Sequence, residues 1–71
     1  MPPFRIATGT VATFDDHRGY GTVREPDGHE WFFHCTAIAD GSRTIAEATP
    51  VTFAVVPGHL GRWEAVDLRP T

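Results

Sequence analysis

Lysine, asparagine and glutamine are absent from this sequence, and cysteine occurs once, as Cys35. A lone cysteine excludes a disulfide within the chain and a metal site built from several thiolates, and it is typical of a reducing compartment. Long apolar runs are also missing: none approaches the roughly 18 residues of a membrane span, and the Met-Pro-Pro-Phe-Arg start lacks the apolar core of a signal peptide. We therefore predict a cytoplasmic protein with no membrane partner.

Positive charge is scarce as well. The 6 basic residues are all arginine, and against 9 acidic residues they leave a formal net charge of −3. Proteins that bind nucleic acid tightly usually neutralise several phosphates with Lys or Arg. Any nucleic-acid binding by this chain must therefore depend on stacking more than on bulk charge. With 71 residues the chain is near the lower size limit for a self-sustaining core, so we expect one domain over residues 1–71.

Five segments have the alternating or β-branched pattern that is typical of short strands, and turn-forming residues separate them. The expected strands are 6–14, 20–24, 30–34, 51–56 and 63–68. Residues 36–47 have no clear period and are predicted to form a loop, with a helical turn near 36–38. Pro26-Asp27-Gly28 and the 57–61 segment are expected to be turns. Since no segment has the pattern of an amphipathic helix, we predict an all-β fold, a small closed or nearly closed barrel.

The period of two also predicts which side chains fill the barrel. We expect an interior built from Val11, Val23, Trp31, Phe33, Ile38, Val51, Phe53 and Val55.

Two of the expected strands interleave aromatic residues with glycines and a basic residue. They are Arg18-Gly19-Tyr20-Gly21-Thr22-Val23 and Trp31-Phe32-Phe33-His34-Cys35. If these strands pair as a hairpin, Tyr20, Phe32 and His34 share one exposed face, and stacking on such rings is worth about 1–3 kcal/mol per base. The simpler reading is ordinary barrel surface, because isolated exposed aromatics are common. The joint placement of three rings on one face favours a site for unpaired bases.

The remaining polar residues suggest contacts to nucleic acid more than catalysis. Arg18 follows a turn, so it is suited to a phosphate or to stacking on a base, although a solvated turn residue is the alternative. Asp15, Asp16, Glu25, Asp27 and Glu30 are expected to form turns and to accept hydrogen bonds from base edges. They accompany no nucleophile with a base and an orienting group, and the histidines lack ligand spacing. We therefore expect no enzyme, no metal, no cofactor and no small-molecule substrate.

Taken in order, these pieces resemble the cold-shock domain family. Gly9-Thr10-Val11 with Phe14-Asp15, the 18–23 segment, and Phe32-Phe33-His34 with Thr36-Ala37-Ile38 resemble its successive motifs, and the match extends from about residue 9 to 68. The resemblance implies a five-stranded antiparallel barrel of the OB type that binds single-stranded RNA and DNA with little sequence specificity, as an RNA chaperone does, and with a preference for pyrimidines. The site residues that it implies are Phe14, Arg18, Tyr20, Glu30, Phe32 and His34.

The departures from the family pattern concern the same face. The family usually has aromatic rings at the positions of Thr13, Thr22 and Cys35, and basic residues are frequent at those of Ala12 and Leu60. We therefore expect weaker binding than in typical members. The alternative is a barrel that keeps the fold but has little nucleic-acid affinity and acts as a protein-interaction or regulatory module. We expect a monomer, with strand exchange through the middle loop as the other option, and the sequence leaves open where Trp63 packs.

Overall fold

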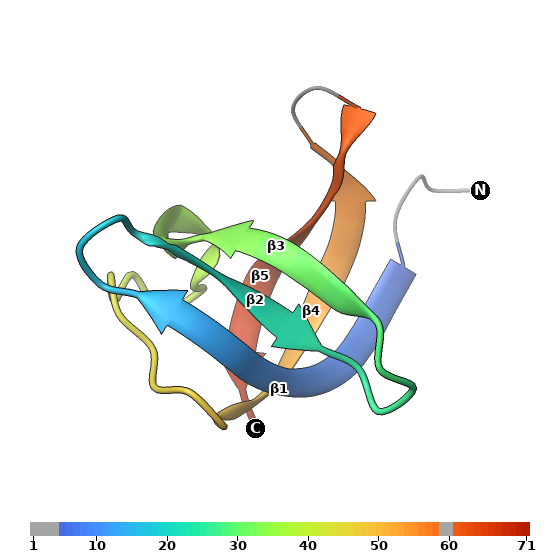
Figure 1. Cartoon of the computed structure of the whole chain (residues 1–71), viewed down its shortest axis with the longest axis horizontal. Coiled ribbons are helices and arrows are strands. Elements are labelled where there is room, and N and C mark those ends of the chain that lie inside the picture. Colours follow the sequence, from blue (N-terminus) through green and yellow to red (C-terminus); the bar gives the residue numbers. More distant parts are fainter. Residues whose placement is uncertain (1–4, 59–60) are drawn as a thin grey trace.

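The computed structural model describes residues 5–58 and 61–71. It contains five strands and one short 3-10 helix (Figure 1). The elements are β1 (Arg5–Asp15), β2 (Tyr20–Arg24), β3 (Glu30–His34), η1 (Cys35–Ala37), β4 (Pro50–Pro57) and β5 (Trp63–Pro70). Within the described residues no helix is both long and apolar enough to cross a membrane. The predicted turn at 57–61 lies partly outside the described residues.

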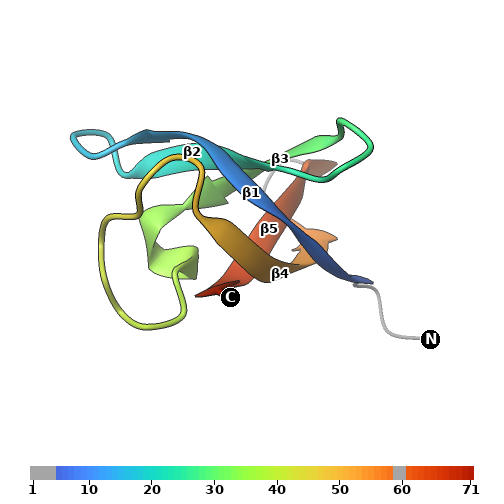
Figure 2. The ribbon, with the colours of Figure 1, turned by 90° about the horizontal axis from the view of Figure 1, so that it is seen from below.

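The strands form a closed barrel in the order β1-β2-β3-β5-β4, and Figure 2 shows β1 crossing from one side of the barrel to the other. This confirms the predicted all-β barrel. The prediction that all neighbouring strands run antiparallel is wrong at one seam, where β3 and β5 run parallel. The reason is parity: neighbouring strands in a closed ring can all alternate in direction only if the number of strands is even.

Strand β1 belongs to two ladders. Residues Arg5 to Thr10 pair with β4, and Thr10 to Asp15 pair with β2, with an irregularity in register between Val11 and Thr13. Such irregularities bend a strand and increase its local twist. The bend is what allows one 11-residue strand to serve both sides of so small a barrel.

Close backbone approach requires glycine on β2. A Cβ atom at Gly21 would overlap the carbonyl oxygen of Thr13 on β1. Gly21 therefore allows the two backbones to approach closely where β1 bends, as expected for a glycine within a strand.

The interior is apolar and agrees with the predicted pattern except at one position. All of the predicted interior residues other than Trp31 are buried, and the buried hydrophobic set is Ala7, Val11, Val23, Phe33, Ile38, Val51, Phe53, Ala54, Val55, Ala65 and Leu68. Trp31 is only partly buried and packs against the edge of this core.

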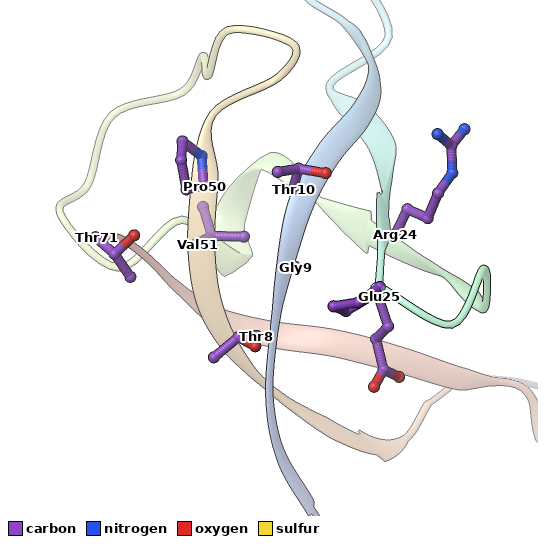
Figure 3. A pocket seen from close by; sticks show the side chains of 9 residues that line it. Thr8, Gly9, Thr10, Arg24, Glu25, Pro50, Val51 and Thr71 are labelled. Carbon is purple, nitrogen blue, oxygen red and sulfur yellow. The ribbon is translucent and has the colours of Figure 1, made fainter.

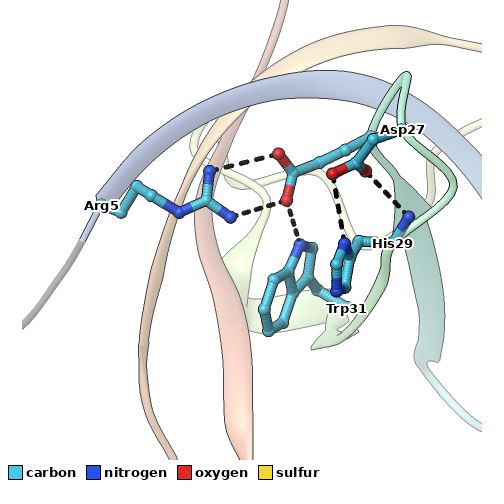
Figure 4. A network of polar contacts seen from close by, with 5 residues as sticks. Arg5, Asp27, His29 and Trp31 are labelled. Atoms are coloured by element: carbon cyan, nitrogen blue, oxygen red, sulfur yellow. Dashed lines mark hydrogen bonds and ion pairs between the residues drawn. The ribbon is translucent and has the colours of Figure 1, made fainter.

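The polar surroundings of Trp31 explain its position (Figure 4). Its indole Nε1 donates a 2.5 Å hydrogen bond to Glu25, and Arg5 donates two more to the same carboxylate, at 3.2 and 2.7 Å. The His29 ring stacks on the indole with a centroid distance of 5.8 Å. A buried indole N–H needs an acceptor, so the ring lies at the barrel edge where Glu25 supplies one. The hydrogen bonds from Arg5 and then Trp31 lower the pKa of Glu25 below its ordinary value of 4.5.

Candidate nucleic-acid interface

Three rings lie side by side on the outer surface of the β2–β3 hairpin. The register pairs Tyr20 with His34 and Thr22 with Phe32, so these four side chains share one side of the sheet. The centroids of Tyr20 and Phe32 are 5.4 Å apart, and those of Phe32 and His34 are 4.9 Å apart. Tyr20 and Phe32 are partly exposed and His34 is exposed. We call Tyr20, Phe32 and His34 the aromatic face.

A cation adjoins this face. The carboxylate of Asp15 accepts hydrogen bonds from the backbone N–H groups of His17 and Arg18, both at 3.0 Å, which shapes the turn before β2. The Arg18 guanidinium then donates to the hydroxyl of Tyr20 at 3.1 Å. This hydrogen bond, with the nearby Asp15 carboxylate, raises the pKa of Arg18 above its already high ordinary value. The structure therefore holds a permanent positive charge at the edge of the first ring.

The other two residues that the sequence predicted for the site are not part of the row of rings, although Phe14 lines a hollow together with Tyr20 and Phe32. Phe14 is half-buried and stacks on Phe33, with centroids 5.7 Å apart and planes 9° from parallel. Both rings flank Gly21 in the ladder, so Phe14 lies on the core side of the sheet. Glu30 lies on the same side as Phe32, further from Tyr20, and its carboxylate accepts from Arg24 at 3.0 and 2.9 Å.

A hollow of about 220 Å³ opens beside the rings. It lies where the family pattern would have two more aromatic side chains, at Thr13 and Thr22, whose hydroxyl groups are joined by a 2.9 Å hydrogen bond. Besides these threonines, its lining includes three aromatic residues, Phe14, Tyr20 and Phe32, and two acidic residues, Asp15 and Glu47. The sequence revealed the missing rings but not the contribution of Glu47, which comes from a loop without a periodic pattern.

A larger hollow of about 450 Å³ lies elsewhere, between the middle of β1, the beginning of β4 and the end of β2 (Figure 3). Threonine, proline and glycine dominate its lining, together with Arg24 and Glu25. None of the residues that line it is aromatic, so it provides no ring on which a base could stack.

Most arginines near the sheet already have acidic partners. Ion pairs join Arg5 to Glu25, Arg24 to Glu30 and Arg69 to Asp67, at 2.7, 2.9 and 3.1 Å. Arg18 is 3.9 Å from Asp15, a longer separation. Over residues 5–58 and 61–71, no cluster of three or more His, Cys, Asp or Glu residues could hold a metal ion.

Comparison of the sequence with known proteins shows the family to which the chain is similar. The family described as "'Cold-shock' DNA-binding domain" matches residues 7–71. The chain is 43% identical over 58 residues to cold shock-like protein CspA of Stigmatella aurantiaca, covering 79% of this chain and 85% of that protein. It is 36% identical over 57 residues to cold shock-like protein CspD of Bacillus cereus, covering 79% and 86%. It is also 42% identical over 64 residues to glycine-rich protein 2 of Nicotiana sylvestris, covering 87% of this chain but only 30% of that protein.

Proposed function

Because the chain belongs to the cold-shock domain family, we propose that it binds single-stranded RNA or DNA, as a monomer, by stacking unpaired bases on the aromatic face. The observation that carries the proposal is the row of three partly or fully exposed rings with centroid spacings of 5.4 and 4.9 Å. Stacking accepts every base, so the contact holds strands open with little sequence specificity, in the manner of an RNA chaperone.

Each site residue has a role in this proposal. Tyr20, Phe32 and His34 stack on bases, and Arg18 contacts a phosphate next to the first ring. Phe14 stacks on Phe33 and, as part of the lining of the hollow beside Tyr20 and Phe32, adds apolar surface for a bound base. Glu30 provides a hydrogen-bond acceptor for base edges at the far end of the face.

We expect the affinity to be lower than in family members with a complete set of rings. The net charge of −3 disfavours a polyanion, and the ion pairs of Arg24 and Arg69 must weaken before either residue can serve a phosphate. About 1–3 phosphate contacts are therefore expected, so stacking has to supply most of the binding free energy.

A second function is favoured by the positions at which this chain departs from the family pattern. Threonines stand in place of two rings, and acidic side chains surround the face, which suits a barrel that has exchanged nucleic-acid binding for a protein-interaction or regulatory role. The first function predicts that the protein binds an added oligonucleotide, whereas the second predicts little or no binding.

The test is a titration of a fluorescently labelled oligo-dT or oligo-U, followed by anisotropy, with two matched variants. Tyr20→Ala removes a ring from the aromatic face and is expected to weaken binding about 5- to 140-fold, the equivalent of 1–3 kcal/mol. Trp63→Ala removes a larger exposed ring, one that strand alternation directs to the side opposite Phe32, and should bind like the parent. No binding by the parent would favour the interaction module, and equal losses in both variants would exclude a site centred on the aromatic face.

A further inference from the structure

We propose that the hollow beside the aromatic face is a base pocket that prefers nucleobases with an amino group on the Watson–Crick edge, namely cytosine, adenine and guanine, over thymine and uracil. This inference rests on the proposed function, because a base must first reach the face. The pocket would add a preference for certain bases to stacking that by itself accepts every base.

The size and walls of the hollow suit a single base. Its volume of about 220 Å³ lies below the roughly 300–1,000 Å³ of ordinary small-molecule pockets, which matches one flat ring system better than a larger ligand. The rings of Tyr20 and Phe32 line it, and their centroids are 5.4 Å apart. A base that stacks on Phe32 can therefore turn one edge towards the threonines.

The two threonines that line the hollow provide both a donor and acceptors. Thr13 and Thr22 share one hydrogen bond of 2.9 Å, which uses one of their two hydroxyl hydrogens. The second hydrogen and the remaining oxygen lone pairs stay available to a ligand. A base edge with an acceptor next to a donor, such as N3 and the 4-amino group of cytosine, complements this pair of hydroxyl groups.

The two acidic residues of the lining, Asp15 and Glu47, determine which bases the hollow prefers. A carboxylate accepts hydrogen bonds and donates none, so Asp15 and Glu47 favour an edge with amino hydrogens. One oxygen of Asp15 is already occupied by the backbone N–H groups of two turn residues. Glu47 is exposed, and no hydrogen bond of its side chain is found within the described part of the chain. We therefore assign the discrimination chiefly to Glu47.

Thymine and uracil present the opposite pattern. Their Watson–Crick edge carries one N–H between two carbonyl oxygens, and a carboxylate that approaches this N–H also faces these oxygens. A polar site that rejects a mismatched hydrogen-bonding pattern discriminates more strongly than an apolar pocket does. The resulting preference differs from the general pyrimidine preference that the family resemblance implies, because it separates cytosine from thymine.

The experiment compares labelled oligo-dC, oligo-dA and oligo-dT of equal length by anisotropy at one salt concentration. The parent protein should bind oligo-dC and oligo-dA about tenfold more tightly than oligo-dT. Glu47→Gln keeps the shape but replaces one of the two carboxylate oxygens with an NH2 donor and removes the charge, so it should bring the ratio of the dC and dT affinities close to one. Asp67→Asn is the matched control, because it removes the same charge from a residue that does not line the hollow, and it should keep the ratio of the parent.

A double variant, Thr13→Trp with Thr22→Phe, fills the hollow with rings. It should bind all three oligonucleotides more tightly and should lose the preference. If the parent binds none of the three, the proposed function itself fails. If the parent binds all three equally, or if Glu47→Gln and Asp67→Asn change the ratio alike, binding stands but the base pocket is refuted.

Discussion

Phe32 and Phe33 are adjacent in sequence and lie on opposite sides of the same strand. The same substitution should therefore affect binding at one position and stability at the other. Phe33 is fully buried, and its ring stacks on Phe14. Phe32 is partly exposed and contacts the rings of Tyr20 and His34. Phe33→Ala should therefore damage the fold, whereas Phe32→Ala should damage the binding of nucleic acid.

The magnitudes separate the two variants clearly. Truncation of a buried phenylalanine costs about 3–5 kcal/mol of unfolding free energy. A domain of 71 residues has roughly 4–11 kcal/mol in total, so Phe33→Ala should be close to unfolding at room temperature. Loss of cross-strand ring contacts at Phe32 should cost about 1 kcal/mol or less. Loss of one stacked base should weaken binding about 5- to 140-fold.

Urea unfolding followed by tryptophan fluorescence measures the stabilities, and anisotropy with a labelled oligonucleotide measures the binding. Binding by Phe33→Ala is measured where the urea curve shows that it is folded, for example at low temperature, and should then be close to that of the parent. Parent-like binding by Phe32→Ala would refute stacking on this face. Parent-like stability of Phe33→Ala would refute the packing of the barrel.

Three further predictions concern charge, acid and backbone packing. The logarithm of the binding constant should fall with the logarithm of salt concentration with a slope of only about −0.7 to −2, as 1–3 phosphate contacts imply; a much steeper slope would contradict this. Because folding lowers the pKa of Glu25, its carboxylate stabilises the fold above pH 4.5, and this stabilisation is lost as the pH falls below 4.5. Below pH 4.5 the unfolding free energy of the parent should therefore drop more steeply than that of Glu25→Gln. Gly21→Ala should cost about 1–3 kcal/mol or more in urea unfolding, because its Cβ overlaps the Thr13 carbonyl; an unchanged midpoint would argue against the close approach.

Much of the fold was predictable because alternation is a local property. Val51, Phe53 and Val55 alternate with less buried or smaller neighbours, and all three are buried as the pattern indicates. The ends of the long strands were less predictable. Arg5 extends β1 and Pro70 extends β5 because each lies opposite a residue of β4, and such pairing is not visible in the sequence near either end.

The placement of the candidate site residues was predictable where it depended on one hairpin and not where it depended on segments distant in sequence. Tyr20, Phe32 and His34 share a face because two short strands pair in register. By contrast, the interior position predicted for Trp31 came from its alternation with Phe33, and this local pattern could not reveal the hydrogen bond from its indole to Glu25. Glu47 reaches the hollow from a loop whose path is set by the whole barrel. The roles of all these residues in binding remain predictions for the experiments above.

The parallel seam between β3 and β5 is where we expect the barrel to open locally, because the antiparallel ladders on either side of it can stay intact. Across it, Phe32 pairs with Glu64, and a separate bridge joins Ile38 to Leu68. The β1–β2–β3 meander and the β4–β5 hairpin are each held by their own ladders, so rupture of this seam is a local opening event, visible as faster amide hydrogen exchange. Phe32 belongs both to the seam and to the aromatic face. An oligonucleotide that stacks on the Phe32 side chain only when the seam is closed would stabilise the closed barrel by mass action. Its binding should therefore slow amide hydrogen exchange along β3 and β5.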